Sequence, residues 1–465
     1  DPPAAHPLIG DISPPTPAQH DMLDYARSAP QSPAYHLQWM CTIEGSLDTA
    51  RLQRAWQCVI DRHAILRTTF AWSEDVPPLQ VVRRQVQLPW IEHDLRDIDE
   101  AAQAAALDQL LRHDHAEHFD IRRPLLMRLV LVQLAEQRYQ MIWSHHHLLL
   151  DGWSVPLVIE ELFAYYDALQ RGLELRRREA PIYPSFERRR RPTGPLGPVF
   201  QPPPVRPFRE FIAWQQRHDP HSGAAFWRAM LHGFSRPNQL TQPGMAGGID
   251  RLVARVQFDS AATAALQALA QRERLTLNTL VQGAWALTVA QYSNQLDVVF
   301  GTTVAGRPAD LPGVERMIGM FINTLPLRIG IDPAQLLVPW LQSIQERAVE
   351  MRQYEQTPLR LIRRWSAVSD AQPLFESIVR FQNYPVAEGV WQRAAGLELR
   401  RPQVIDWWGY PLALVAEPGP PLVLTLDADP QHQTHAAVER LLARLQTILL
   451  SMAANPLQRL VDFLV

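Results

Sequence analysis

The chain has 465 residues, of which 46% are hydrophobic, and its formal net charge at pH 7 is −3. This length exceeds the usual size of one hydrophobic core, so we expect two lobes. The small net charge provides no general attraction to nucleic acid or to an anionic membrane, and we expect neither as a partner.

The cysteine count argues against a disulfide framework and a cysteine metal site, and the apolar pattern argues against a membrane span. Cys41 and Cys58 are too few for a disulfide framework and lack metal-ligand spacing. No stretch approaches the roughly 18–20 apolar residues of a membrane span, and the first residues lack the pattern of a signal peptide. We therefore expect a bacterial cytoplasmic protein. Because the sequence begins without methionine, we also expect it to be part of a longer chain.

Helices and strands alternate over the first 170 residues. The strongest helical pattern covers residues 47–63, where apolar residues recur on one face. The other expected elements are a short helix from residue 19, helices at 101–113 and 154–171, and strands at 125–133 and 138–144. This alternation predicts an α/β lobe.

The composition changes after this lobe. Residues 176–207 are rich in arginine and proline and show neither helical nor strand periodicity. We expect a linker or a disordered insertion there, between an N-terminal lobe at 1–175 and a C-terminal lobe at 208–465. A solvated loop is favoured over contact of the arginine run with RNA or an acidic partner.

The second half again mixes helices and strands. We expect helices at 208–216, 224–231, 260–272, 278–292, 333–352 and 434–453, and strands at 252–258, 298–303, 412–416 and 422–427. The pattern predicts a second α/β lobe.

Three histidines follow the strand at 138–144. Side chains alternate along a strand, so His145 and His147 should face one way and His146 the other, which prevents the three from binding one ion. The i, i+4 spacing of a helical metal site is absent as well, so we expect no metal. Ser154, followed by Pro156, is typical of a helix N-cap. The histidines thus precede a helix N-terminus, which favours developing negative charge.

A single histidine at a strand end is usually structural, but a longer pattern is present here. Residues 146–152, His-His-Leu-Leu-Leu-Asp-Gly, resemble the HHxxxDG motif of the condensation domains of nonribosomal peptide synthetases. Residues 61–70 resemble the family's RHxxLRTxF motif, and residues 306–308 and 318–328 resemble GRP and IGxFxNTxPxR. The resemblance covers nearly the whole chain, with one insertion. Asp24 departs from it, because relatives often have an aromatic residue there.

The resemblance implies a fold and a reaction. The fold would be α/β, with two chloramphenicol-acetyltransferase-like lobes in a V-shaped pseudo-dimer, a tunnel between them, and a floor loop and a latch in the C-terminal lobe. The reaction would transfer an aminoacyl or peptidyl group from a donor carrier-protein thioester to the α-amine of an acceptor aminoacyl carrier protein, in antibiotic or other secondary-metabolite synthesis. Both substrates would be attached to phosphopantetheine arms of the carrier proteins, and the domain itself would bind no cofactor. Adenylation and epimerisation domains would be neighbours.

The resemblance also implies roles for residues. His147 would accept a proton from the amine or hold the amine, and it would open into the tunnel. Backbone N–H groups around Gly152 would receive the oxyanion. Arg307 would form an ion pair with Asp151 that links the lobes. The residues implied as structural are His146, Asp151, Arg307 and Arg62, and those implied as substrate-binding are Arg67, Trp153, Ser154 and Asn323. Ser144 lacks the G-x-S-x-G context of a nucleophile.

Several alternatives stay open. Residues 16–19, 148–150 and 320–324 favour a domain with a D-configured donor and an L-configured acceptor, and a domain with an L-configured donor is the alternative. A catalytically silent carrier-binding module of the same fold is a rival, although it would typically lose the histidine motif. A free-standing acyltransferase that uses coenzyme A or a soluble amine is another.

Overall fold

The computed structural model describes residues 8–29, 32, 34–73, 75–175, 199–241, 251–369, 372–383, 396–406 and 408–464. The chain divides into two compact units. Unit 1 comprises Asp1–Arg217, Arg307–Phe321 and Tyr384–Trp408, and unit 2 comprises His218–Gly306, Ile322–Asn383 and Gly409–Val465. Two segments of the second half therefore belong to unit 1. The lobe boundaries that we expected, with consecutive lobes at 1–175 and 208–465, stay a prediction.

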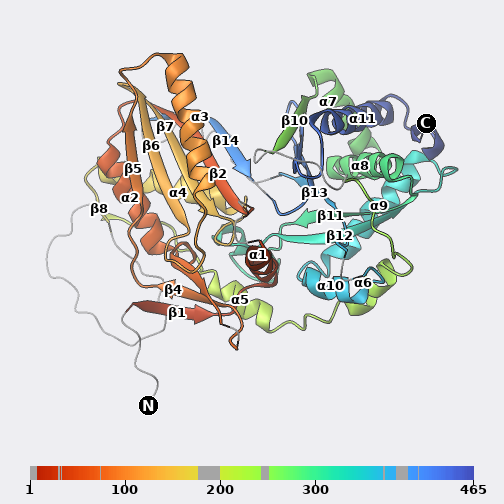
Figure 1. Ribbon diagram of the computed structural model, residues 1–465, viewed down its shortest axis with the longest axis horizontal. Helices are drawn as coiled ribbons and strands as arrows, with labels where there is room; N and C mark the ends of the chain where they lie inside the picture. Colours follow the sequence, from red (N-terminus) through yellow and green to blue (C-terminus); the bar gives the residue numbers. More distant parts are fainter. Residues whose placement is uncertain are drawn as a thin grey trace. The chain divides into compact units, whose positions relative to one another are not determined.

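A five-stranded sheet forms the centre of unit 1 (Figure 1). Its strands, in spatial order, are β14 (Glu398–Asp406), β2 (His36–Glu44), β7 (Arg138–His146), β6 (Met127–Ala135) and β5 (Trp90–Asp94). All neighbours are antiparallel except β5 and β6. In the β2–β7 pair His36 lies opposite His146, so these two side chains share one face of the sheet.

Helices cover both faces of this sheet. Helices α2 (Thr49–Arg62) and α4 (Ser154–Gln170) cover one face, where Trp56 of α2 packs on Trp143 of β7 with 4.9 Å between ring centroids. Helix α3 (Glu100–Ala116) covers the other, where Asp114 accepts a hydrogen bond from Gln38 of β2 at 2.6 Å. The apolar face predicted for the helix at 47–63 is buried, which confirms it. Because both faces are covered, β2 and β7 are buried along most of their length.

Smaller elements complete unit 1. Helix α1 (Pro17–Ser28) begins with a capping box at Thr16, and α5 (Arg209–Gln216) lies near the end of the first segment. A second sheet contains β1 (Ile9–Ser13), β4 (Leu79–Arg83) and β3 (Thr68–Ala71), which follows a 3-10 turn at Ala64–Arg67. The strands β8 (Glu174–Leu175) and β9 (Val199–Phe200) pair with each other. Most of the expected linker, residues 176–198, lies outside the described residues.

Unit 2 is built on a six-stranded sheet. Its strands, in spatial order, are β10 (Leu252–Gln257), β16 (Val423–Ala428), β15 (Leu412–Glu417), β13 (Ser377–Phe381), β11 (Asp297–Val304) and β12 (Asn323–Gly330). Its helices are α6 (Ala224–Met230), α7 (Ser260–Arg272), α8 (Leu277–Ser293), α9 (Leu337–Arg352), α10 (Leu359–Trp365) and α11 (His435–Ala454). Buried side chains of α7, α8, α9 and α11 share one core with the sheet.

The expected helices and strands are present, and the α/β class is confirmed in both units. Ten strands of the described residues escaped prediction, namely β1 to β5, β8, β9 and β12 to β14. β12 contains Pro326 and β14 contains Pro402, and proline is a poor indicator of a strand. None of the helices in the described residues is both long and apolar enough to cross a membrane.

Candidate active site

The site is built at the turn between β7 and α4. His147 donates its backbone N–H to the carbonyl of Tyr35 at 2.7 Å, and Asp151 donates its own to the carbonyl of Gly319 at 3.0 Å. Leu148, Leu149 and Leu150 between them are fully buried. The turn is therefore anchored at both ends and packed in the middle.

The carboxylate of Asp151 is fully buried, and both of its oxygens have hydrogen-bond donors. Its Oδ1 accepts from the backbone N–H of Ser154 at 2.8 Å and lies 3.2 Å from Nη2 of Arg307. Its Oδ2 accepts from the backbone N–H of Phe321 at 3.2 Å. The expected ion pair with Arg307 is thus present. A buried carboxylate with this many donors serves to hold the turn and does not act as an acid.

The side chain of Arg307 is buried too, with 4% of it exposed. Its guanidinium also donates to the carbonyls of Val314 and Met317, and it lies over the ring of Phe321 at 3.9 Å from the centroid. Burial lowers the pKa of Arg307, and the neighbouring Asp151 charge opposes this effect. Both side chains belong to unit 1, so the pair is internal to that unit. The link that we expected between lobes at 1–175 and 208–465 stays a prediction, as those boundaries do.

Ser154 occupies a different position from the one expected. It is the first residue of α4, not the N-cap, and the cap bond to its N–H comes from Asp151. Its hydroxyl lies 2.7 Å from Asp151 Oδ1, 2.9 Å from the carbonyl of Gly319 and 3.0 Å from Arg307 Nη2. The geometry gives Ser154 a structural part here. Its substrate-binding role, implied by the resemblance, stays a prediction.

Replacing Gly319 by alanine is expected to destabilise the protein by about 1–3 kcal/mol, the usual effect of overpacking a dense core. A Cβ atom at this position would lie 2.1 Å from Cδ2 of Phe208. Chemical denaturation of the purified variant measures the loss. Gly330→Ala is the matched control, because a Cβ there meets nothing within 4 Å. Equal stability of the two variants would contradict the close packing at Gly319.

Two of the three histidines confirm the predicted alternation along β7. His145 is fully buried on the face of α2 and α4, with its ring 4.6 Å from that of Trp143. Burial lowers its pKa well below the usual value. His146 lies on the opposite face, and its Nδ1 accepts from the N–H of Leu148 at 3.1 Å. Burial, followed by the nearby His36 and His147, lowers the pKa of His146 to about 3. Both rings are therefore neutral at pH 7.

These pKa shifts predict loss of stability in mild acid. In the unfolded chain a histidine binds a proton near pH 6.5, whereas His145 and His146 resist protonation when folded. Each of these two histidines therefore lowers the free energy of unfolding by up to about 1.4 kcal/mol per pH unit as the pH falls from 6.5 toward 5. Urea denaturation of the wild type and of His145→Phe across this range is the measurement. The variant should show the shallower decline, and parallel declines would contradict the assignment.

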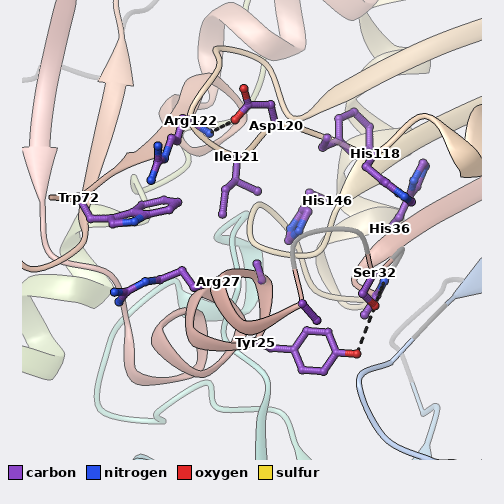
Figure 2. A pocket seen from close by; sticks show the side chains of 14 residues that line it. Tyr25, Arg27, Ser32, His36, Trp72, His118, Asp120, Ile121, Arg122 and His146 are labelled. Atoms are coloured by element: carbon purple, nitrogen blue, oxygen red, sulfur yellow. Dashed lines mark hydrogen bonds between the residues drawn. The ribbon is translucent and has the colours of Figure 1, made fainter. Parts of the chain in front are cut away.

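His147, which we expected to contact the amine, has a buried side chain. His147 is 1% exposed, and its ring meets the edge of Trp408 with 4.5 Å between centroids. We had expected this ring to open into a passage, and it is not accessible to solvent. Among the three histidines it is His146 that lines a cavity of unit 1, with Tyr25 and Trp72 on other walls (Figure 2). His146 is nevertheless buried within unit 1, and its structural role stays a prediction.

The remaining residues that we singled out have structural contacts. Arg62 forms an ion pair with Glu161 of α4 at 3.3 Å. Arg67 donates to the carbonyls of Ile60, Asp61, Arg83 and Arg84. Trp153 donates to the carbonyl of Glu315 at 2.9 Å, beside the partly buried Gly152. In unit 2, Asn323 donates to the carbonyls of Glu355 and Thr357. The substrate roles of Arg67, Trp153 and Asn323 and the oxyanion role of Gly152 stay predictions.

Sequence reasoning missed the partners of the motif residues. Tyr35 and Trp408 lie far from the histidines in sequence and belong to none of the motifs. Gly319 and Phe321 lie in the segment that resembles IGxFxNTxPxR, which was the available signal for them. No group of three or more His, Cys, Asp or Glu side chains in the described part of the chain is arranged to hold a metal ion.

Comparison with known proteins gives concordant matches. A family model described as "Condensation domain" matches residues 10–191 and 197–464. One of the linear gramicidin synthase proteins of Brevibacillus parabrevis is 40% identical over 459 residues, which are 98% of this chain and 6% of that protein. Chondramide synthase of Chondromyces crocatus is 34% identical over 424 residues, 91% of this chain and 10% of that protein. The chain thus spans about a tenth or less of these relatives.

Solved structures show the same fold. The starter condensation domain of rhizomide synthetase superposes with a TM-score of 0.80 at 20% identity and 97% coverage of both chains. A four-domain nonribosomal peptide synthetase bound to AMP and glycine gives a TM-score of 0.81 at 18% identity, covering 99% of this chain and 34% of that one. At these identities the likeness supports the fold alone.

Proposed function

Since the chain belongs to the condensation-domain family, an acyltransferase family that forms amide bonds, we propose that it makes peptide bonds within a nonribosomal peptide synthetase. The donor is an aminoacyl or peptidyl thioester on one carrier protein. The acceptor is the α-amine of an aminoacyl group on a second carrier protein. In the reaction a C–N bond forms, the C–S bond breaks, and the proton lost by the amine ends on the donor thiolate.

The observation that carries the proposal is the fixed geometry of the turn at 146–152. Its histidine pair sits between β7 and α4, and the Asp151 carboxylate is held by Arg307, Ser154 and Phe321. A rigid turn places the His147 ring at a defined point beside the start of a helix. Holding the amine and the thioester together there supplies much of the rate enhancement.

His147 is the group to which we assign contact with the amine. An α-ammonium has a pKa near 7.7–8.0, so much of it is protonated at neutral pH and must lose a proton before it attacks. A neutral imidazole accepts such a proton or orients the amine by a hydrogen bond. His147 is 1% exposed and its ring lies against Trp408 among other side chains, so the amine reaches it only after neighbouring side chains move. Gly152, at the helix start, offers its backbone N–H to the oxyanion.

We further propose that the donor is D-configured. Two of the segments that favour this subtype touch each other, because Gln19 donates its side-chain N–H to the carbonyl of Leu148 at 2.8 Å. Gln19 also closes the capping box of α1 with Thr16. Residues 16–19 and 148–150 are thus joined by a buried hydrogen bond next to the histidine turn. Use of L-configured donors stays the alternative.

The test is reconstitution with loaded carriers. The purified protein is mixed with a donor carrier loaded with a D- or L-aminoacyl group and an acceptor carrier loaded with an L-aminoacyl group, and mass spectrometry detects the dipeptidyl carrier. We expect product, and more of it from the D-donor. Carrier binding without product would favour a silent recruitment module. Turnover of coenzyme A thioesters with free amines, without any carrier, would favour the free-standing acyltransferase.

The partners follow from this reaction. We propose donor and acceptor carrier proteins as direct partners, with adenylation and epimerisation domains as neighbours in the longer chain. The domain itself would bind no cofactor, because the phosphopantetheine belongs to the carriers. The expected product is a peptide natural product of the kind made by peptide synthetases.

A further inference from the structure

Two residues beside the end of β7 have an unusual backbone conformation. Among the described residues, four residues other than glycine have a positive φ, namely Tyr35, Leu125, Arg274 and Asn294. Arg274 and Asn294 follow the ends of α7 and α8, where a left-handed residue commonly ends a helix. Tyr35 and Leu125 lie instead just before β2 and β6, the two strands that flank β7. A left-handed backbone costs a bulky residue free energy, so it persists only where the surroundings impose it.

Both residues lie where β7 passes into the histidine turn. Successive N–H groups of a central antiparallel strand point to opposite neighbours. The N–H of His147 therefore reaches toward β2 and binds the carbonyl of Tyr35 at 2.7 Å. The N–H of His146 reaches toward β6 and binds the carbonyl of Leu126 at 2.9 Å. One left-handed residue thus carries the carbonyl that anchors His147, and the other, Leu125, directly precedes the carbonyl that anchors His146.

The ring of Tyr35 holds this residue in its conformation. It packs edge-on against Tyr25 of α1, with 5.5 Å between the ring centroids. The hydroxyl of Tyr25 lies 3.2 Å from Oγ of Ser32, and this Oγ accepts the N–H of Ala34 at 3.2 Å. The ring and the residue before it are therefore both tied to Tyr25. Loss of the ring would remove this support, while the cost of a left-handed backbone would remain for any residue with a Cβ atom.

We propose that Tyr35 is a positioning residue of the reaction, which fixes the His147 imidazole through the backbone. The ring keeps residue 35 left-handed, this conformation aims its carbonyl at the His147 N–H, and the hydrogen bond sets the point from which the His147 side chain projects. A residue that relaxed to an extended backbone would turn this carbonyl or displace the entry to β2, and the imidazole would shift with it. The inference rests on the proposed function and deepens it, because it identifies what places the group assigned to the amine.

The experiment compares residues with and without a Cβ atom at position 35. Tyr35→Ala and Tyr35→Gly both lose the ring, but only glycine adopts a left-handed backbone without a steric cost. In the reconstituted carrier assay we expect Tyr35→Ala to lower kcat about tenfold and Tyr35→Gly to recover most of this loss. The KM for each loaded carrier should stay unchanged, because the effect acts on the transition state alone. A general loss of stability predicts the reverse order, since glycine gives the unfolded chain more freedom than alanine.

Arg274 provides the matched control. It is also left-handed, with a φ of 56°, but it is exposed in unit 2. Arg274→Ala and Arg274→Gly should therefore leave kcat and KM at the wild-type values. If Tyr35→Ala does not fold, Tyr35→Asn and Tyr35→Leu give the same comparison. These two side chains have nearly the same shape, but asparagine tolerates a left-handed backbone better, so the asparagine variant should be the faster one.

Amide hydrogen exchange tests the anchor without turnover. The His147 N–H, followed by mass spectrometry, should exchange faster in Tyr35→Ala than in the wild type and regain protection in Tyr35→Gly. Equal kcat in the alanine and glycine variants, a raised KM, or wild-type exchange in the alanine variant would overturn the inference. If the wild type makes no dipeptide, the proposed function fails, whereas the expected order of exchange rates would still support Tyr35 as the anchor of His147.

Discussion

Replacing Asp151 by alanine is expected to cost about 3–5 kcal/mol of folding stability, a large part of the total for most domains. The substitution leaves the buried guanidinium of Arg307 without its counter-charge. It also removes the acceptor for the backbone N–H groups of Ser154 and Phe321. Chemical denaturation followed by tryptophan fluorescence measures the change.

A surface pair of the same kind is the control for this loss. Glu160 and Arg316 lie 3.4 Å apart with both side chains about half exposed. Glu160→Gln is therefore expected to cost less than about 1 kcal/mol, because solvent screens the pair. If Asp151→Ala were as mild as Glu160→Gln, the buried pair would not hold the turn. The double variant Asp151→Ala/Arg307→Met should recover part of the loss, since it removes the stranded charge.

Replacing His147 by alanine is expected to lower the rate of dipeptide formation by about 10²–10⁴-fold, the usual effect of losing a general base. The reconstituted carrier assay under single-turnover conditions measures the rate. The variant should remain folded, as thermal unfolding will show, because the backbone N–H that anchors the turn to Tyr35 is retained. A loss of less than tenfold would contradict a proton-accepting role.

Two further variants make this result specific. His147→Asn keeps a hydrogen-bonding side chain but cannot accept the proton at neutral pH. Equal loss in the alanine and asparagine variants supports proton transfer, and partial recovery by asparagine supports positioning of the amine alone. His435→Ala is the matched control, because this histidine lies exposed at the start of α11 in unit 2, 3.4 Å from Glu439. Its activity should equal that of the wild type.

Much of the fold could be predicted because periodicity is a local property. The apolar face of α2 repeats every three to four residues, and β7 alternates up to the histidines. The opposite orientations of His145 and His146 follow from the same alternation. The β14 strand was missed because its place beside β2 depends on a segment more than three hundred residues further along the chain.

The candidate site, like the fold, could be predicted only in part. The sequence alone determined the family, the order of most helices and of six strands, and the histidine, aspartate and arginine positions, because these depend on residue identity and local spacing. Only the tertiary structure decided that Trp408 packs against the buried His147, that His146 faces a cavity, and that backbone groups of Gly319 and Phe321 bind at Asp151. These contacts join segments distant in sequence. Their partners are selected by packing and by the need to pair buried polar groups, which no local pattern encodes.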